Sequence, residues 1–246
     1  MTDLTPAAQI PDIREARRLF PATEGRIYLN TAAVGLASRR LAATYHQLID
    51  EWTAAGFDYT RGERAADGAR SAVARLIGAD DSDVALIPSV SSAAGLVGAQ
   101  FGPAVRGENV VIGAQEYSSN HFPWRQLAHK GYDVRQVPFR NGGLEPQDVA
   151  GRVDAGTQLI AFSGVQTATG HRSDIAAISS LARAVGAIVF VDGSQLVGAL
   201  PVAHDLPYVE VLTAPDHKFL LKLLSPSSTT SDPSTSTHAT ASSPPQ

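Results

Sequence analysis

Short apolar runs alternate with helical segments from residue 84 to residue 212, and this alternation constrains the fold more than any other feature. We predict strands at 84–87, 109–112, 134–137, 158–162, 187–191 and 208–212, with helices at 92–101, 119–130 and 175–185 between them. Connections of this length join parallel strands by right-handed crossovers. The sequence therefore predicts an α/β fold in which helices sandwich a mostly parallel sheet.

The two ends of the chain differ from this regular part. We expect a loose arm and a short helix over residues 1–20, a strand at 26–29, and helices at 37–54 and 63–77. Residues 225–246 are almost all Ser, Thr, Pro and Ala, and burial of such side chains cannot offset the entropy lost on ordering. We therefore predict one large domain over residues 21–224 and a disordered tail over 225–246.

Composition excludes several classes of function. The chain has 20 Lys and Arg against 24 Asp and Glu, and no basic block indicates nucleic acid or an acidic membrane as a partner. It contains no cysteine, which rules out disulfides, thiolate metal sites and a cysteine nucleophile within it. No apolar run reaches membrane-spanning length, and the N-terminus lacks the order of a signal peptide. We expect a cytoplasmic protein without a metal.

Asp192 and Lys218 are the strongest candidates for chemistry. Asp192 ends a β-branched apolar run, where a buried parallel strand presents its last residue to a cleft. Lys218 lies among apolar residues, and burial there lowers the pKa of the amine and makes it nucleophilic. Alternatively, Asp192 caps the next turn and Lys218 is a surface lysine. Enzymes that use pyridoxal phosphate (PLP) need such a pair, a lysine for a Schiff base and a carboxylate for the pyridinium nitrogen.

Two serines indicate a place for a phosphate. Ser91 and Ser92 lie between a predicted strand and a predicted helix, where hydroxyls, free N–H groups and the helix dipole favour an anion. The commoner role of such a serine is to cap the helix. Taken alone, this motif favours the cap.

Further polar and aromatic residues follow predicted strand ends: Tyr117, Gln166, Gln195 and His217. Tyr117 could stack on an aromatic ring or pack within its loop. Gln195 could donate to a phenolate oxygen or face solvent, and His217 could bind a phosphate or be a buried histidine with a protein partner. Ligands of open α/β sheets bind at the carboxyl ends of strands, so the combination indicates one site there.

Six short segments, in order along residues 20–221, carry a resemblance to a known family: Ile27-Tyr-Leu-Asn-Thr-Ala-Ala33, Pro88-Ser-Val-Ser-Ser92, Glu116-Tyr-Ser-Ser-Asn120, Val165-Gln-Thr-Ala-Thr-Gly170, Val191-Asp-Gly-Ser-Gln195 and Asp216-His-Lys218. Together they resemble fold-type I PLP enzymes of the class V aminotransferase group. That group also includes cysteine desulfurases and isopenicillin-N-epimerase-like proteins. The resemblance implies the large PLP-binding domain of fold type I.

The resemblance implies three catalytic residues. Lys218 would hold PLP as a Schiff base and later move the Cα proton of the substrate. Asp192 would keep the ring nitrogen protonated, which makes the ring an electron sink. Tyr117 takes the place of an aromatic or histidine ring over the cofactor; many desulfurases have histidine there, so this difference weakens the case for desulfurase chemistry.

The resemblance also implies the residues that bind the cofactor. Ser91, Ser92 and His217 would hold the phosphate, and Gln166 and Gln195 would lie near the phenolic oxygen of the ring. An amino acid would be the substrate, processed through an external aldimine by transamination, β-elimination with C–S lysis, or epimerisation. Full-length relatives form homodimers.

The family pattern stops shortly after Lys218, because relatives continue with the rest of the large domain and a small C-terminal domain. We therefore expect a truncated chain without that small domain, with an open sheet edge and exposed apolar surface. An alternative is a non-catalytic remnant or interaction fragment of such an enzyme. A Rossmann-type nucleotide binder is disfavoured, because no Gly-x-Gly-x-x-Gly follows a strand.

Overall fold

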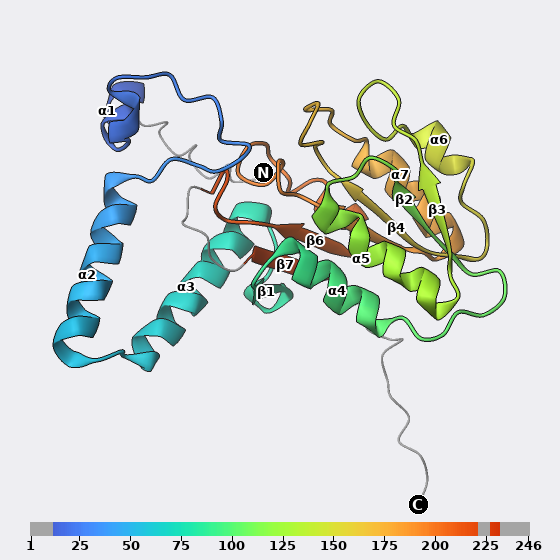
Figure 1. Ribbon diagram of the computed structural model, residues 1–246, viewed down its shortest axis with the longest axis horizontal. Coiled ribbons are helices and arrows are strands. Elements are labelled where there is room, and N and C mark those ends of the chain that lie inside the picture. Colours follow the sequence, from blue (N-terminus) through green and yellow to red (C-terminus); the bar gives the residue numbers. More distant parts are fainter. Residues whose placement is uncertain (1–11, 221–226, 232–246) are drawn as a thin grey trace, which may run out of the picture.

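The computed structural model describes residues 12–220 and the backbone of residues 227–231, and Figure 1 shows their arrangement. Its strands form a seven-stranded sheet with the order β1-β7-β6-β5-β4-β2-β3. The strands are β1 (Val84–Ile87), β2 (Asn109–Gly113), β3 (Asp133–Val137), β4 (Thr157–Ser163), β5 (Ile188–Asp192), β6 (Val211–Ala214) and β7 (Ser227–Ser231). The pairs from β3 across to β6 are parallel, whereas β7 is antiparallel to both of its neighbours. The predicted α/β fold with a mostly parallel sheet is confirmed.

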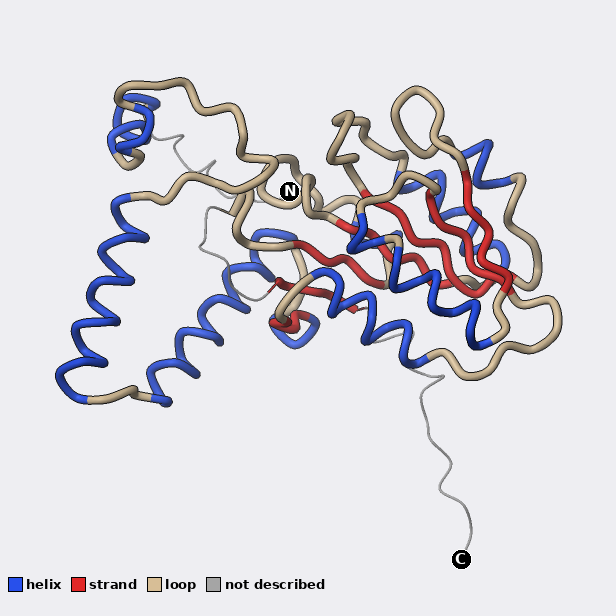
Figure 2. The backbone as a smooth tube through the Cα atoms, viewed as in Figure 1, coloured by secondary structure: helices blue, strands red, loops and turns tan. Residues whose placement is uncertain are grey.

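Helices cover both faces of this sheet (Figures 1 and 2). They are α1 (Ile13–Arg18), α2 (Arg39–Ala55), α3 (Tyr59–Ile77), α4 (Val90–Gln100), α5 (Phe122–Arg125), α6 (Pro146–Ala150) and α7 (Ile175–Val185). Short 3₁₀ turns are η1 (Pro21–Thr23), η2 (Asp81–Asp83), η3 (Ser118–Asn120), η4 (Gln126–Lys130) and η5 (Leu206–Tyr208). Among the described residues, no helix combines the length and the apolar character needed to cross a membrane.

The side chains of each strand point alternately to the two faces of the sheet, so the core has two layers. In β4, Ile160 and Phe162 pack on the side of α3 and α7, while Leu159 and Ala161 pack on the side of α4 and α5. Side chains of successive strand residues point to opposite faces, so a strand covered on both faces is apolar throughout. On the second face, Trp124 meets Phe190 edge-on with ring centroids 4.8 Å apart.

Elements with clear start and stop signals match the prediction. Helix α7 begins after Asp174, which accepts a hydrogen bond from the Ala177 N–H at 2.9 Å, and it ends at Gly186 with φ 76°.

The predicted helix at 119–130 is instead broken into η3, α5 and η4. Pro123 has no N–H to donate and is tolerated only in a first helical turn, so a new helix begins beside it.

Three other predicted elements differ in the structure. Residues 26–29 are not a strand, because no strand among the described residues pairs with them; Ile27 and Leu29 are 83 % and 90 % exposed. The last parallel strand begins at Val211 rather than at residue 208, since residue 208 belongs to the η5 turn, which begins at Leu206 and contains Pro207. Helix α3 begins at Tyr59, four residues earlier than predicted, because Asp58 caps it by accepting from the Arg61 N–H at 3.1 Å.

The prediction of a disordered tail from residue 225 is wrong for residues 227–231, which form β7. Thr230 pairs with Val84 of β1 on one side and with Leu212 of β6 on the other. Backbone hydrogen bonds to two neighbouring strands stabilise a segment that lacks large apolar side chains. We expected an open sheet edge, but β7 covers the side of β6 that faces away from β5. The rest of the predicted tail and residues 1–11 of the predicted arm lie outside the described residues.

Candidate functional site

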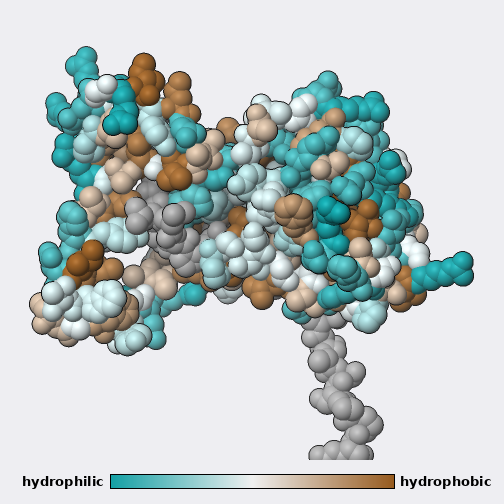
Figure 3. Space-filling view, in the orientation of Figure 1, coloured by the Kyte–Doolittle hydropathy of each residue, from teal (hydrophilic) through white to brown (hydrophobic). Residues whose placement is uncertain are grey.

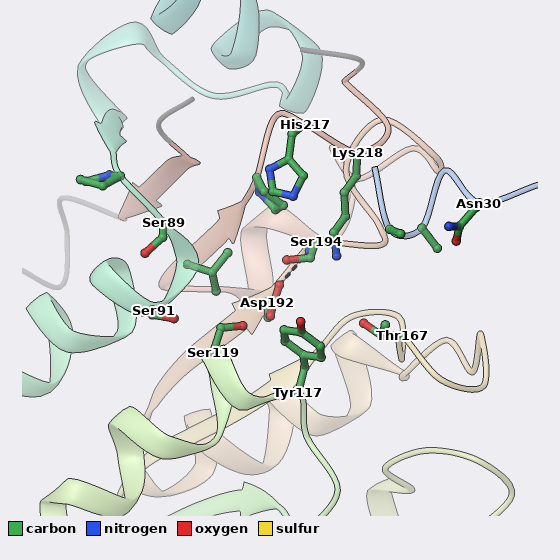
Figure 4. Close-up of a pocket in the computed structure, with 15 residues that line it drawn as sticks. Asn30, Ser89, Ser91, Tyr117, Ser119, Thr167, Asp192, Ser194, His217 and Lys218 are labelled. Atoms are coloured by element: carbon green, nitrogen blue, oxygen red, sulfur yellow. Dashed lines mark hydrogen bonds between the residues drawn. The ribbon is translucent and has the colours of Figure 1, made fainter. Parts of the chain in front are cut away.

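A cavity of about 890 Å³ lies at the carboxyl ends of the strands, the edge predicted for a site. Six segments of the chain line it: Asn30, Ala32 and Ala33; Pro88, Ser89, Val90 and Ser91; Tyr117 and Ser119; Thr167; Asp192 and Ser194; and Pro215, His217 and Lys218. Figure 4 shows these side chains around a common space. Of the predicted site residues, the cavity brings together Ser91, Tyr117, Asp192, His217 and Lys218.

Asp192 is the last residue of β5 and is only 3 % exposed. Its Oδ1 accepts a hydrogen bond from the Ser194 N–H at 2.8 Å, so the turn cap and the cavity position that the sequence offered as alternatives occur together. Burial raises the pKa of this carboxyl, while the hydrogen bonds from Ser194 and the charge of Lys218 act in the opposite direction. Asp192 therefore places a buried carboxyl group at the wall of the cavity.

Lys218 faces Asp192 from the loop after β6 (Figure 4). Its Nζ lies 5.8 Å from the centroid of the Tyr117 ring, a cation–π contact. Burial lowers the pKa of the Lys218 amine, and the nearby Asp192 partly offsets that effect. The loop is fixed from the N-terminal part of the chain, because the Gly35 N–H donates to the His217 carbonyl at 2.8 Å. For His217, burial and then the charge of Lys218 lower the pKa of the imidazole ring. The charge of Asp216 acts in the opposite direction.

Serines gather where β1 leads into α4. Ser89 caps the helix, accepting from the Ser92 N–H at 3.1 Å, and its hydroxyl lies 2.9 Å from that of Ser92. The cap that the sequence assigned to Ser91 or Ser92 therefore belongs to Ser89. Ser89, Ser91 and Ser119 line the cavity, whereas Ser92 does not. Their hydroxyls and the first N–H groups of α4 form an end of the cavity suited to an anion.

The two predicted glutamines lie behind the cavity wall. Gln195 is 6 % exposed, and its Nε2 donates to the Ala32 carbonyl at 3.0 Å and to Thr167 Oγ1 at 3.2 Å. Its Oε1 is buried without a hydrogen-bond partner among the described residues. The Nε2 of Gln166, which is 4 % exposed, donates to Glu116 Oε1 at 2.8 Å. Neither glutamine lines the cavity.

Sequence reasoning missed several residues of this site. Glu116 is a carboxylate only 8 % exposed, directly before Tyr117, and it accepts hydrogen bonds from Ser163 and Gln166. Its signal was an acidic residue in the loop shortly after the apolar strand β2, whereas Asp192 is itself the last residue of β5. The cavity-lining residues Asn30, Ser89, Ser119, Thr167 and Ser194 were also missed, because a hydroxyl or amide in a loop has no pattern that separates it from a turn residue.

Comparison with known proteins then decides the family. The sequence pattern of the family "Aminotransferase class-V" matches residues 27–221, which is most of the chain. The chain belongs to the class V aminotransferase family. Like the site, the matched range runs from the loop of Asn30 to the residues just after Lys218.

Relatives and solved structures extend this result. The chain is 28 % identical over 212 residues to a probable cysteine desulfurase of Methanothermobacter thermautotrophicus, covering 83 % of this chain and 52 % of that protein. The apo cysteine desulfurase from Thermococcus onnurineus NA1 is 22 % identical with a TM-score of 0.77, over 93 % of this chain and 58 % of that one. A C-DES mutant with glycine covalently linked to its PLP cofactor is 16 % identical with a TM-score of 0.81, over 89 % and 60 %. The chain spans about half the length of the curated relatives it matches.

Class V aminotransferases are PLP-dependent, and the residues of this cavity fit the cofactor. PLP carries an aldehyde, a basic ring nitrogen and a phosphate. The cavity offers an amine of lowered pKa at Lys218, a buried carboxylate at Asp192, and serine hydroxyls beside the N-terminus of α4. The Tyr117 ring lies beside the amine. The groups that this cavity offers therefore match the aldehyde, the ring nitrogen and the phosphate of PLP.

Proposed function

We propose that this chain binds PLP in the cavity and attaches it covalently to Lys218. The observation that supports this most is that Asp192 and Lys218, 26 positions apart in the numbering, face one another across one cavity with the phosphate-sized cluster of serines at its end. An amine in a desolvated position is neutral in a larger fraction of molecules and can attack an aldehyde. The buried carboxylate balances the charge that forms on the opposite side of the ring.

Each group in the cavity has a task in this proposal. When bound, PLP supplies an electron sink for the substrate. Asp192 holds a proton on the ring nitrogen, Lys218 carries the proton to and from the substrate Cα, and the Tyr117 ring covers the cofactor. Ser91 and Ser89 bind the phosphate with the first N–H groups of α4, and His217 contributes from the other side.

The remaining predicted residues act around this core. Ser92 holds the hydroxyl of Ser89 in place, since the two hydroxyl oxygens are 2.9 Å apart. Gln166 lies behind the cavity wall, bonded to Glu116, and supports the side near the phenolic oxygen of the ring through Thr167, which follows it and lines the cavity. Gln195 supports the same position through Ala32 and Thr167, both of which line the cavity.

For the reaction, we propose that the complete enzyme acts on an amino acid by transamination, C–S lysis or epimerisation. The similarity to cysteine desulfurases favours C–S lysis, while Tyr117 in place of histidine and the absence of cysteine from this chain argue against persulfide formation within it. We further propose that the protein forms a homodimer and is located in the cytoplasm. A chain without cysteine needs no disulfides and is compatible with that reducing compartment. The second candidate is a non-catalytic protein of this family that binds PLP without turnover; the chain spans about half the length of the relatives it matches.

Covalent labelling tests the cofactor site. The purified chain is mixed with PLP, reduced with borohydride, digested and analysed by mass spectrometry. We expect the label on Lys218, its loss together with the visible absorption band in Lys218→Ala, and retention of both in the matched control Lys222→Ala. A label that persists in Lys218→Ala, or that spreads over the lysines in proportion to their reagent access, contradicts the assignment. Incubation of the loaded chain with amino acids, followed by assays for sulfide and oxo acids, separates the enzyme from the remnant.

A further inference from the structure

Glu116 is a buried carboxylate that the proposed chemistry leaves without a task. Its Oε1 accepts from the Ser163 N–H at 2.9 Å and from Gln166 Nε2 at 2.8 Å. Its Oε2 accepts from the Ser163 hydroxyl, with Asn120 Nδ2 at 3.5 Å. One side chain thus joins the loop after β2, the end of β4 and the loop after β4.

The end of β2 is shaped to receive this side chain. Gly113 is the last residue of β2, and a Cβ atom there would come within 2.6 Å of Phe139 Cε1 and 2.9 Å of Glu116 Cγ. Such distances are far below van der Waals contact, so only glycine lets Glu116 fold back over the strand end. The arrangement is therefore built into the backbone and is not a chance contact between loops.

The residues beside each of these contacts belong to the cavity. Tyr117 follows Glu116 and lines the cavity, and Thr167 follows Gln166 and lines it too. Ser163 is paired with Asp192 in the β4–β5 register. The hydrogen bonds of Glu116 therefore reach the immediate neighbours of Tyr117, Thr167 and Asp192, three residues that surround the proposed cofactor.

Burying this carboxylate is energetically unfavourable. Burial raises the pKa of Glu116, the hydrogen bonds from Ser163 and Gln166 lower it, and the charge of Asp192 raises it further. Among the described residues, no cation contributes to that balance. An apolar side chain would avoid the desolvation, so the carboxylate is explained best by the geometry that its hydrogen bonds impose.

We propose that Glu116 is a positioning residue of the cofactor site, which fixes the Tyr117 ring and the Thr167 hydroxyl around the cavity through its bonds to Ser163 and Gln166. It does not touch the cofactor. Its effect passes through Gln166 on one side and through the backbone to Tyr117 on the other. This inference rests on the proposed binding of PLP at Lys218.

Variants on both sides of the Glu116–Gln166 bond test it. Glu116→Ala removes all four contacts, Glu116→Gln keeps an amide oxygen for Ser163 N–H and Gln166, and Gln166→Leu removes only the donor. The exposed Glu63→Gln on α3 is the matched control for charge. Three quantities are measured for each full-length chain: the melting temperature without cofactor, the Kd for PLP by absorbance titration, and the visible circular dichroism per bound cofactor, which reports how the ring is held.

We expect Glu116→Ala and Gln166→Leu each to weaken PLP binding about tenfold and to reduce the visible dichroism, because both variants lose the Glu116–Gln166 hydrogen bond. The double variant should be no weaker than the worse single one, Glu116→Gln should recover most of the affinity, and Glu63→Gln should match the wild type. Variants that melt earlier but keep the wild-type Kd and dichroism overturn the inference. If Glu116→Ala does not fold, wild-type binding and dichroism in Gln166→Leu overturn it equally. If the unaltered chain binds no PLP, the proposed function fails and takes this inference with it.

Discussion

Asp192 is placed where it weakens the protein without its ligand. The carboxyl is almost fully buried, and it accepts a hydrogen bond from the Ser194 N–H. Lys218 offsets part of the cost, but burial dominates and raises the pKa of Asp192 above its ordinary value of 3.8. Residues tuned for a ligand commonly reduce the stability of the empty protein.

Replacing Asp192 with asparagine should therefore stabilise the cofactor-free chain. Asparagine keeps an oxygen for the Ser194 N–H and removes the buried charge, so at pH 8 we expect the melting temperature to rise by about 3 °C, for about 1 kcal/mol. PLP binding should weaken in the same variant. Melting temperature and PLP titration, measured on the same samples, check both parts.

The difference in stability between the wild type and Asp192→Asn should depend on pH. Since the native pKa of Asp192 is raised, its protonated form is favoured in the folded state, and that contribution is complete below pH 3.8 and lost as pH rises through the native pKa. The wild type should lose stability over this window relative to Asp192→Asn, as followed by denaturant unfolding at several pH values. Parallel stability curves for the two proteins would count against a raised pKa.

Among the individual site residues, the sequence predicted those beside apolar runs and missed those whose position depends on loops. Asp192 and Lys218 stand out because a charge beside a buried strand demands an explanation. The roles of Ser89 and Thr167 are defined only when distant loops meet, as when the Gln195 amide donates both to Thr167 and to the Ala32 carbonyl. Hydrogen-bond partners far apart in the chain are set by the tertiary path, which local patterns do not contain.

Among the elements, the turn after β5 determines where the Lys218 loop lies. Gly198 has φ 86°, and a Cβ atom there would come within 3.1 Å of the Phe219 carbonyl carbon and 3.2 Å of Phe219 Cβ. The residue directly after Lys218 thus rests on a glycine backbone. A side chain at position 198 has to displace this segment.

Gly198→Ala should therefore impair the site as well as the fold. The left-handed backbone alone costs about 1–2 kcal/mol for alanine, and displacement of Phe219 should add a loss of PLP affinity of about tenfold. Gly186→Ala is the matched control, because Gly186 has φ 76° and nothing within 4 Å of the added Cβ. Melting temperature and PLP titration separate the two effects. Equal PLP affinity in the two variants would show that the contact with Phe219 does not position Lys218.

Prediction of the elements succeeded where chain-local signals decide structure. Helix α7 spans residues 175–185 as predicted, and the strands β1 and β2 begin where predicted. It failed where pairing or a single proline decides. Residues 26–29 have the apolar alternation of a strand, but none of the strands that the structure describes pairs with them. Pro123 divides a segment with helical spacing.

The whole molecule consists of a sheet with its helices and a projecting pair of helices, α2 and α3 (Figure 1). Figure 3 shows apolar side chains at the ends of this pair, where Ile49 and Trp52 of α2 are 54 % and 59 % exposed. No residue of α2 is buried, although its spacing is that of an amphipathic helix. The expected exposed apolar surface therefore lies on α2 and on the loop before it, rather than at an unpaired sheet edge.

Strand β7 connects this projecting part to the rest of the sheet. Strand β1, on which α3 packs, pairs with β7, and β7 pairs in turn with β6, which leads to Lys218. The sequence could not predict this strand, because its Ser and Thr residues carry no hydrophobic period. Strands β1 and β6, separated by more than a hundred residues, supply the partners that make the segment a strand.

Thr230→Pro should uncouple the two parts. Thr230 is paired on both sides, and proline removes its N–H from a strand inside the sheet, so we expect a loss of roughly 2–4 kcal/mol in unfolding free energy. Limited proteolysis should then cut at η2, which connects α3 to β1, and PLP affinity should fall because Ser89 follows β1 directly. Thr240→Pro, outside the described strand, is the control. If Thr230→Pro resists protease and denaturant as well as this control does, β7 is not what holds β1 in the sheet.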